Sequence, residues 1–178
     1  MAVDLFNERG YEGTSVDELA TRLGVTKSAI YHHVSSKEQL LRMAVDRALD
    51  GLFAVLTTAS EQQGAAIDTL EAVVRGSVEV LVDQLPFVTL LLRVRGNTEV
   101  EREALARRRE FDHAVTQLVQ RAERAGDVRE DVNPAVTSRL LFGMVNSLIE
   151  WYQPRDDGNS AELADAVCAI AFDGLRTR

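Results

Sequence analysis

A segment of the sequence, GVTKSAIYHHVSSKEQL at residues 24–40, concentrates side chains that can donate hydrogen bonds to phosphates and to nucleotide bases. Lysine, tyrosine, histidine and serine recur in it, and no carboxylate lies between Arg22 and Lys37. The chain as a whole has a formal net charge of −8, which argues against indiscriminate binding to nucleic acid. A carboxylate-free stretch in such an acidic chain therefore predicts one local face that approaches a polyanion.

Two short predicted helices, residues 15–23 and 26–34, carry this segment, and Gly24-Val25 joins them. This layout is typical of a helix-turn-helix, and glycine permits the positive φ that such a turn often needs. We expect the apolar seam between the helices to consist of Leu19, Ala20, Leu23, Val25 and Ile30. The outward-facing residues near the start of the second helix are then Lys27, Ser28, Tyr31 and His32. A recognition helix presents this end to base edges in the major groove.

Three further residues suit phosphate groups. Thr14 and Ser15 begin the helix over residues 15–23, where hydroxyls and free backbone amides favour an anion. Lys37 begins the next helix, where a cation opposes the helix dipole, so we interpret it as a phosphate contact. The alternative is an exposed helix face without function. A metal site at His32-His33 is disfavoured, because helix neighbours point about 100° apart and no other ligand falls at a suitable spacing.

The elements that position these residues are all predicted to be helices, because apolar residues recur at helical rather than alternating spacing. Asn133-Pro134 is a typical helix start, and four capping boxes open other helices: Ser15/Glu18, Ser35/Glu38, Thr98/Glu101 and Asn159/Glu162. The predicted helices are 2–9, 15–23, 26–34, 36–60, 66–84, 86–93, 99–125, 134–152 and 160–175. We expect an all-α protein with a helix-turn-helix domain at 1–43 and a second helical domain at 44–178, which share the long fourth helix.

Composition excludes several classes of function. The sequence lacks a nucleophile elbow, a glycine-rich phosphate loop and a zinc signature, so we expect neither an enzyme nor a cofactor or metal. Cys168 is the only cysteine, which rules out an intrachain disulfide, fits a reducing cytoplasm and suggests a small buried residue. No signal peptide is visible, and no apolar run approaches the about 20 residues that cross a bilayer, so no membrane association is expected.

The stretch LFNERGYEGTSVDELATRLGVTKSAIYHHVSSKEQLL resembles the DNA-binding domain of the TetR family of transcriptional regulators over about residues 5–43. The later GDVREDVNP resembles the junction before the family's penultimate helix. The resemblance implies three DNA-binding helices, a linking fourth helix and a divergent C-terminal domain that binds a small molecule and dimerises. The DNA contacts it implies are Thr14, Ser15, Lys27, Ser28, Tyr31, His32 and Lys37. Family members usually carry a basic segment before the first helix. This sequence starts inside that helix, so the basic segment is either lacking from the protein or lies outside the given sequence.

The last two predicted helices carry apolar stripes, and the resemblance implies that they pair with their copies in a four-helix interface. The expected interface residues are Leu140, Met144, Leu148, Ala164, Val167 and Ala171. Two-fold symmetry would then place two recognition helices about 34–36 Å apart, one turn of DNA. The alternative is that these stripes belong to a core within one chain.

An effector pocket is expected in the C-terminal region, because ligand pockets are mostly apolar with a few polar anchors. Its candidate lining residues are Phe87, Leu91, Phe111, Val115, Phe142, Asn146 and Trp151, and ordinary core packing is the alternative for each apolar one. His113 and Arg93 are further candidate anchors. These features predict a homodimeric repressor that leaves a palindromic operator when a largely apolar small molecule binds. The competing hypothesis is a helical carrier or partner-binding protein that no longer binds DNA.

Overall fold

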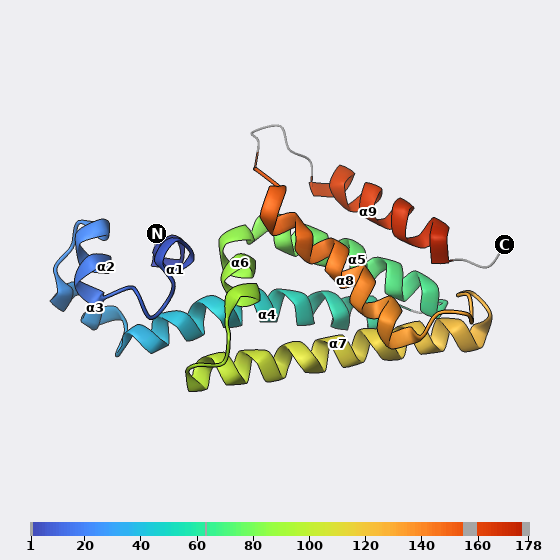
Figure 1. The fold of residues 1–178 in the computed structure, drawn as a ribbon, viewed down its shortest axis with the longest axis horizontal. Helices are drawn as coiled ribbons and strands as arrows, with labels where there is room; N and C mark the ends of the chain where they lie inside the picture. The colour runs from blue at the N-terminus through green and yellow to red at the C-terminus, as the bar shows by residue number, and fades with distance from the viewer. Residues whose placement is uncertain (1, 63, 155–159, 176–178) are drawn as a thin grey trace. The chain divides into compact units, whose positions relative to one another are not determined.

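The computed structural model describes residues 2–62, 64–154 and 160–175, which form nine α-helices (Figure 1). Each helix predicted from the sequence is present, with ends within one residue of those expected. The helices are α1 (Ala2–Arg9), α2 (Val16–Leu23), α3 (Lys27–His33), α4 (Lys37–Glu61), α5 (Ala66–Asp83), α6 (Leu85–Arg93), α7 (Glu99–Ala125), α8 (Pro134–Trp151) and α9 (Ser160–Leu175). None of these described helices is both long enough and apolar enough to cross a membrane.

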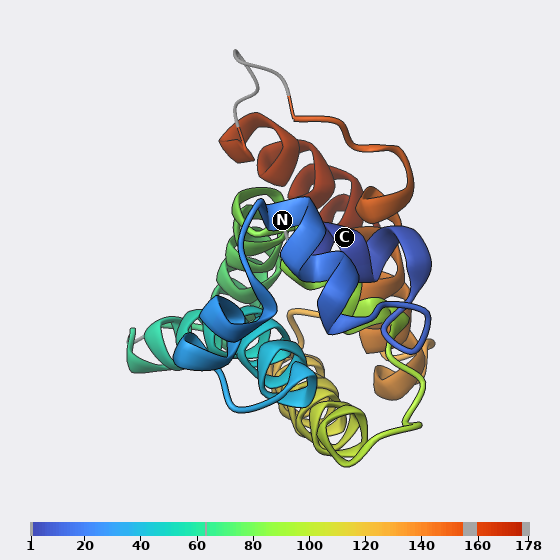
Figure 2. The same cartoon turned by 90° about the vertical axis from the view of Figure 1, so that its left-hand side faces the viewer.

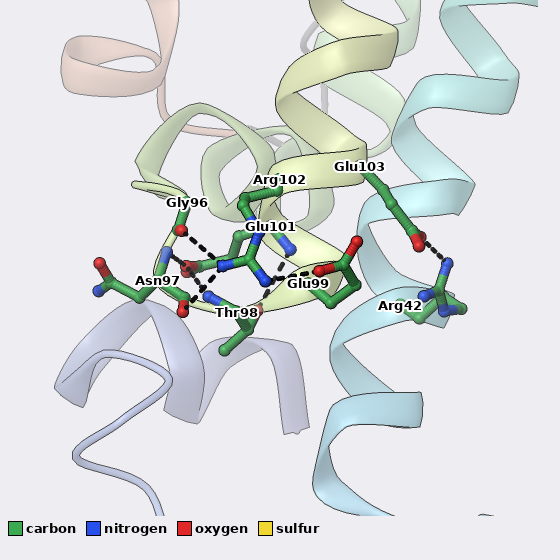
Figure 3. Close-up of polar contacts among 8 residues, drawn as sticks. All are labelled: Arg42, Gly96, Asn97, Thr98, Glu99, Glu101, Arg102 and Glu103. Carbon is green, nitrogen blue, oxygen red and sulfur yellow. Dashed lines mark hydrogen bonds and ion pairs between the residues drawn. The ribbon is translucent and has the colours of Figure 1, made fainter.

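Local capping chemistry explains several of these helix starts. At α2, the Glu18 amide donates to Ser15 Oγ at 3.2 Å, and the Ser15 amide donates back to the Glu18 carboxylate at 3.0 Å. At α7 the same reciprocal arrangement joins Thr98 and Glu101, as Figure 3 shows. Asn133 caps α8 by accepting the amide of Ala135 at 2.9 Å. Each cap satisfies amides that the first turn of a helix leaves without partners.

The start of α4 differs from the predicted capping box at Ser35 and Glu38. The helix begins one residue later, and Ser36 caps it by accepting the amide of Gln39 at 3.1 Å. Gln39 takes the place expected for Glu38, since its side-chain oxygen accepts from Ser35. Two adjacent serines followed by Glu-Gln offer both registers, so the sequence alone does not choose between them. The predicted box at Asn159 lies outside the described residues.

The chain divides into two compact units, residues 1–49 with 84–106 and residues 50–83 with 107–178. Helices α4 and α7 each continue from one unit into the other. Within the first unit, α6 packs against α1, and Asn7 Nδ2 donates to the carbonyl of Pro86 at 2.8 Å. The predicted division at 43/44 therefore falls inside the continuous helix α4, and it separates α6 from the N-terminal helices on which α6 packs.

The first unit has a small core beneath the helix-turn-helix. Phe6, Leu19, Ile30 and Leu41 come from four different helices and are all buried. Gly24 ends α2 with φ of +67°, which favours glycine. Val25 differs from expectation, because it is 45% exposed at the turn and does not belong to the seam.

The second unit is built around α5, which α9 and α8 both cover (Figures 1 and 2). Apolar residues recur along α5 at helical spacing, including the fully buried Leu70, Val74 and Val78. On α9, Cys168 is buried, as expected of it. Gly76 allows α5 to approach α4 closely, since a Cβ there would lie 2.6 Å from Cγ1 of Val55.

Candidate nucleic-acid interface

The N-terminal half of α3 carries the outward-facing residues of the first unit. Thr26 caps α3 by accepting the amide of Ala29 at 3.2 Å. Ile30 faces the core. Four residues on the other side of the helix are exposed, and they form two pairs separated by four positions: Lys27 with Tyr31 and Ser28 with His32. This spacing puts hydroxyl, ammonium and imidazole groups on one face of the helix. Such groups can donate to phosphates and read base edges in the major groove.

Lys27 does not stand alone on this face. Its ammonium lies 2.9 Å from the Asp17 carboxylate of α2, and both side chains are largely exposed. The hydrogen bond to Asp17 and the charge of Asp17 raise the pKa of Lys27. The segment from Arg22 to Lys37 contains no acid, yet the neighbouring helix supplies one. An exposed pair of this kind is weak in water, so a phosphate can compete for the lysine.

Ion pairs also hold α2 against α1. Arg22 pairs with Glu8 at 3.0 Å, and Arg9 pairs with Glu18. In the sequence Arg22 marks one end of the carboxylate-free stretch, and its acidic partner lies 14 residues earlier in the chain. These contacts orient α2 relative to α1 and reduce the net positive charge of this region.

The two predicted phosphate contacts at the start of α2 have different surroundings. Ser15 is exposed, and its hydroxyl takes part in the cap of α2. Thr14 is only 1% exposed, and its hydroxyl donates to the carbonyl of Gly10 at 2.8 Å. The Thr14 side chain therefore stabilises the turn between α1 and α2 and is not available to a phosphate. The sequence alone does not show whether a hydroxyl two residues before a helix is buried or exposed.

Lys37 is partly exposed at the start of α4. Its ammonium donates to the carbonyl oxygens of Tyr11 and Thr14, both at 2.9 Å, and lies 4.2 Å from the centre of the Tyr11 ring. Two of its three N–H groups are thus occupied by the turn between α1 and α2.

The candidate effector residues divide between the two units. Phe87 and Leu91 lie on α6 in the first unit, where Leu91 is buried and Arg47 stacks 4.5 Å from the Phe87 ring centre. In the second unit, Phe111 contacts Phe142 edge-on at a centroid distance of 5.2 Å.

A third ring extends this cluster, since Phe53 lies 5.8 Å from Phe111. Val115 is buried on α7, the helix that also carries Phe111. On α8, Asn146 is partly exposed and Trp151 is 60% exposed. The structure therefore unites Phe111, Val115 and Phe142 in one core region but leaves Trp151 on the surface. The candidate anchor His113 is exposed and bonds Gln117.

The residues expected at a dimer interface also separate into two groups. Leu140 is 65% exposed and Met144 is partly exposed, as an interface between chains requires. Four others are buried inside the single chain, largely because α9 packs along α5: Leu148, Ala164, Val167 and Ala171. Three further apolar residues of α8 and α9 are exposed although they were not among the expected interface residues: Val136, Trp151 and Ile170. Val136 and Leu140 lie one helical turn apart, a signal that the i, i+4 pattern already contained.

Comparison with known proteins identifies the chain. Residues 1–44 match the family model for bacterial regulatory proteins of the tetR family, and residues 63–175 match the tetracycline repressor-like C-terminal domain. The crystal structure of a TetR family regulator from Streptomyces coelicolor A3 is 54% identical, covers 99% of this chain and 89% of that chain, and has a TM-score of 0.92.

Two further relatives have assigned roles. The transcriptional repressor KstR2 of Rhodococcus jostii RHA1 is 25% identical over 98% of this chain and 87% of its own length. The structure of AibR with isovaleryl coenzyme A and operator DNA is 27% identical, covers 96% of this chain and 94% of that chain, and has a TM-score of 0.79. The chain belongs to the TetR family of transcriptional regulators, and it is a ligand-responsive, DNA-binding regulator rather than an enzyme.

Proposed function

We propose that the exposed face of α3 reads the operator of this regulator in the major groove. The observation that supports this most strongly is the grouping of Lys27, Ser28, Tyr31 and His32 on one exposed side of a short helix. Ser15 adds a phosphate contact at the start of α2, where its side chain is exposed and its hydroxyl, which also caps the helix, lies at the positive end of the helix dipole. Thr14 is left out because its hydroxyl is buried and bonded within the turn.

We propose a homodimer that binds a palindromic operator. The exposed apolar residues of α8 and α9 support it, since Leu140, Trp151 and Ile170 are each at least 60% exposed in the single chain. Exposed apolar side chains that form one continuous patch mark interaction sites. A two-fold axis through such a surface would present two copies of α3 to half-sites about one helical turn apart.

The effector is proposed to bind in the second unit, near the ring cluster of Phe53, Phe111 and Phe142. An aromatic cluster of this kind favours a largely apolar small molecule. An acyl thioester such as the isovaleryl coenzyme A bound to AibR is the first class to test. A regulator that binds operator DNA is also proposed to act in the cytoplasm.

Release of DNA requires that the effector bind one conformation more tightly than another, because a ligand shifts an equilibrium only through its differential affinity. Helices α4 and α7 run through both units. They provide continuous backbone along which a change in the second unit reaches the helix-turn-helix.

The proposal is tested by selecting duplexes from a random-sequence library with the full chain and measuring affinity for the selected site. Tyr31→Ala is expected to weaken binding by about tenfold or more, because it removes a side chain that meets a base or its phosphate. Tyr152→Ala, on a tyrosine outside the first unit, is the matched control. An unaltered affinity in Tyr31→Ala with a selected, symmetric site would reject the proposed face. Failure to select any duplex would favour the carrier hypothesis.

A further inference from the structure

The turn between α1 and α2 is held from two sides. On one side, the Tyr11 ring packs edge-on against the buried Phe6 at a centroid distance of 5.4 Å. On the other side, the ammonium of Lys37 bonds the carbonyl oxygens of Tyr11 and Thr14, and it lies over the same ring. Lys37 thus connects the first residue of α4 to a turn that lies 23 to 26 residues earlier in the chain.

This arrangement has consequences for α2. The turn carries the backbone directly into Ser15, the N-cap residue of α2. The carbonyl of Tyr11 also accepts the Thr14 amide at 3.2 Å, so the lysine reinforces a bond already within the turn. Fixing both carbonyl oxygens fixes where the first turn of α2 begins relative to α4.

A lysine at this position also needs an explanation beyond helix stability. A cation in the first turn of a helix opposes the helix dipole. Hydrogen bonds from a charged donor to two carbonyl oxygens, with an aromatic ring beneath, offset that unfavourable position. A neutral side chain of similar length lacks the three N–H donors of an ammonium group, and it places no positive charge over the ring.

We propose that Lys37 is a positioning residue for operator recognition, which holds the α1–α2 turn in register with α4 so that Ser15 and α3 meet the DNA together. This inference rests on the proposed DNA-binding face. The positioning role differs from the phosphate contact expected from the sequence, because Lys37 would act in the free protein and through other residues.

The two roles predict different results in two measurements, duplex preference and amide exchange in the free protein. A lost phosphate contact weakens binding to every duplex about equally and leaves the free protein unchanged. A lost positioning contact lowers the preference for the selected duplex over a scrambled one. It also speeds amide hydrogen exchange in the turn and at the start of α2 before any DNA is added.

The experiment compares the full wild-type chain with Lys37→Gln and with the same substitution at Lys27, using the selected duplex and a scrambled duplex. For Lys37→Gln we expect the ratio of the two affinities to fall about tenfold and exchange at residues 11–18 to rise about tenfold. Amides of α5 serve as the internal control and should stay unchanged. Lys27→Gln is expected to leave exchange at 11–16 as in the wild type. Lys37→Arg should restore most of the protection, since a guanidinium also donates to carbonyls and stacks on tyrosine.

Equal weakening on both duplexes with unchanged exchange in Lys37→Gln would overturn the positioning role in favour of a phosphate contact. No change in either measurement would overturn both roles. If Lys37→Gln does not fold, Tyr11→Leu takes its place, because it removes the ring beneath the ammonium and keeps both carbonyl oxygens. Unchanged exchange at residues 11–18 in Tyr11→Leu would then reject the proposal. The wild-type affinity ratio tests the DNA-binding function separately from these variants.

Discussion

Two leucines on α8 give opposite predictions for the same substitution. Leu140 is 65% exposed in the single chain, whereas Leu148 is 1% exposed, two helical turns further along. If two chains pair through the exposed face, dimerisation removes the remaining surface of Leu140 from water. Replacing Leu140 with alanine should then affect association, and replacing Leu148 should affect folding.

The expected size follows from these exposures. Complete burial of a leucine side chain contributes about 1.5–3 kcal/mol, so burying the exposed part of Leu140 contributes about 1–2 kcal/mol in each chain. Two copies lie in a symmetric interface, which gives about 2–4 kcal/mol for the dimer and about a hundredfold increase in its dissociation constant. Leu148→Ala leaves a cavity in a packed core and should lower the free energy of unfolding by about 2–5 kcal/mol.

Sedimentation equilibrium measures the dissociation constant, and urea unfolding followed by helical circular dichroism measures stability at a fixed chain concentration. Leu140→Ala should shift the monomer–dimer equilibrium while the dissociated chain keeps its helicity. An unaltered dissociation constant in Leu140→Ala would refute the interface on this face of α8. A smaller loss of stability in Leu148→Ala than in Leu140→Ala would refute the assigned burial.

Three more predictions concern separate contacts. Asp17→Asn should tighten binding to both selected and scrambled duplexes by about threefold, because it frees Lys27 and removes a carboxylate that repels phosphates; weaker binding in fluorescence anisotropy would contradict it. The pKa of Glu18 lies below its ordinary value of 4.5, chiefly through the hydrogen bond from the backbone of the N-cap serine. The charged Glu18 carboxylate therefore stabilises the folded protein fully above pH 4.5, and this stabilisation is lost as pH falls through the lower pKa of the folded state. Glu18→Gln should remove this acid sensitivity from amide exchange in α2. An unchanged pH profile of exchange in the variant would count against the role of Glu18. Gly76→Ala should cost about 1–3 kcal/mol of stability, since its Cβ would meet Val55 at 2.6 Å; Val55→Ala in the same chain should recover part of this loss, and additive losses in thermal unfolding would argue against the clash.

The positions of the helices could be predicted because the signals that set them are local. The glycines after α2 and α7 and the caps at Ser15, Thr98 and Asn133 each act within about one helical turn. The start of α4 shows the limit of such reasoning, because two consecutive serines both suit an N-cap. A choice between them depends on Gln39, whose side chain reaches back to Ser35.

Which face of a helix meets which neighbour could not be predicted in the same way. Small residues on α9, such as Ala164 and Ala171, suit close packing against another chain or against α5, and the structure places them against the chain's own core. The partners of Lys27 and Lys37 were missed for a related reason. Local net charge counts neighbours in sequence, whereas Asp17 and the Tyr11 carbonyl are neighbours only in space.

The grouping of the candidate effector residues also depended on tertiary structure. Phe111 and Phe142 lie on different helices, and the apolar pattern of each helix suggested core or pocket equally well. Their edge-on contact appears only in the folded unit. Phe87 carries the same kind of sequence signal, yet α6 packs with α1 in the other unit.

Methylation interference on the selected duplex reports whether α3 lies in the major groove, because N7 of guanine and its methyl adduct lie in that groove. If two copies of α3 read the operator, methylation should block binding at two clusters of guanines about one helical turn apart, related by two-fold symmetry. Interference at a single cluster, or binding that tolerates methylation at every guanine, would show that two copies of α3 do not read the operator in the major groove.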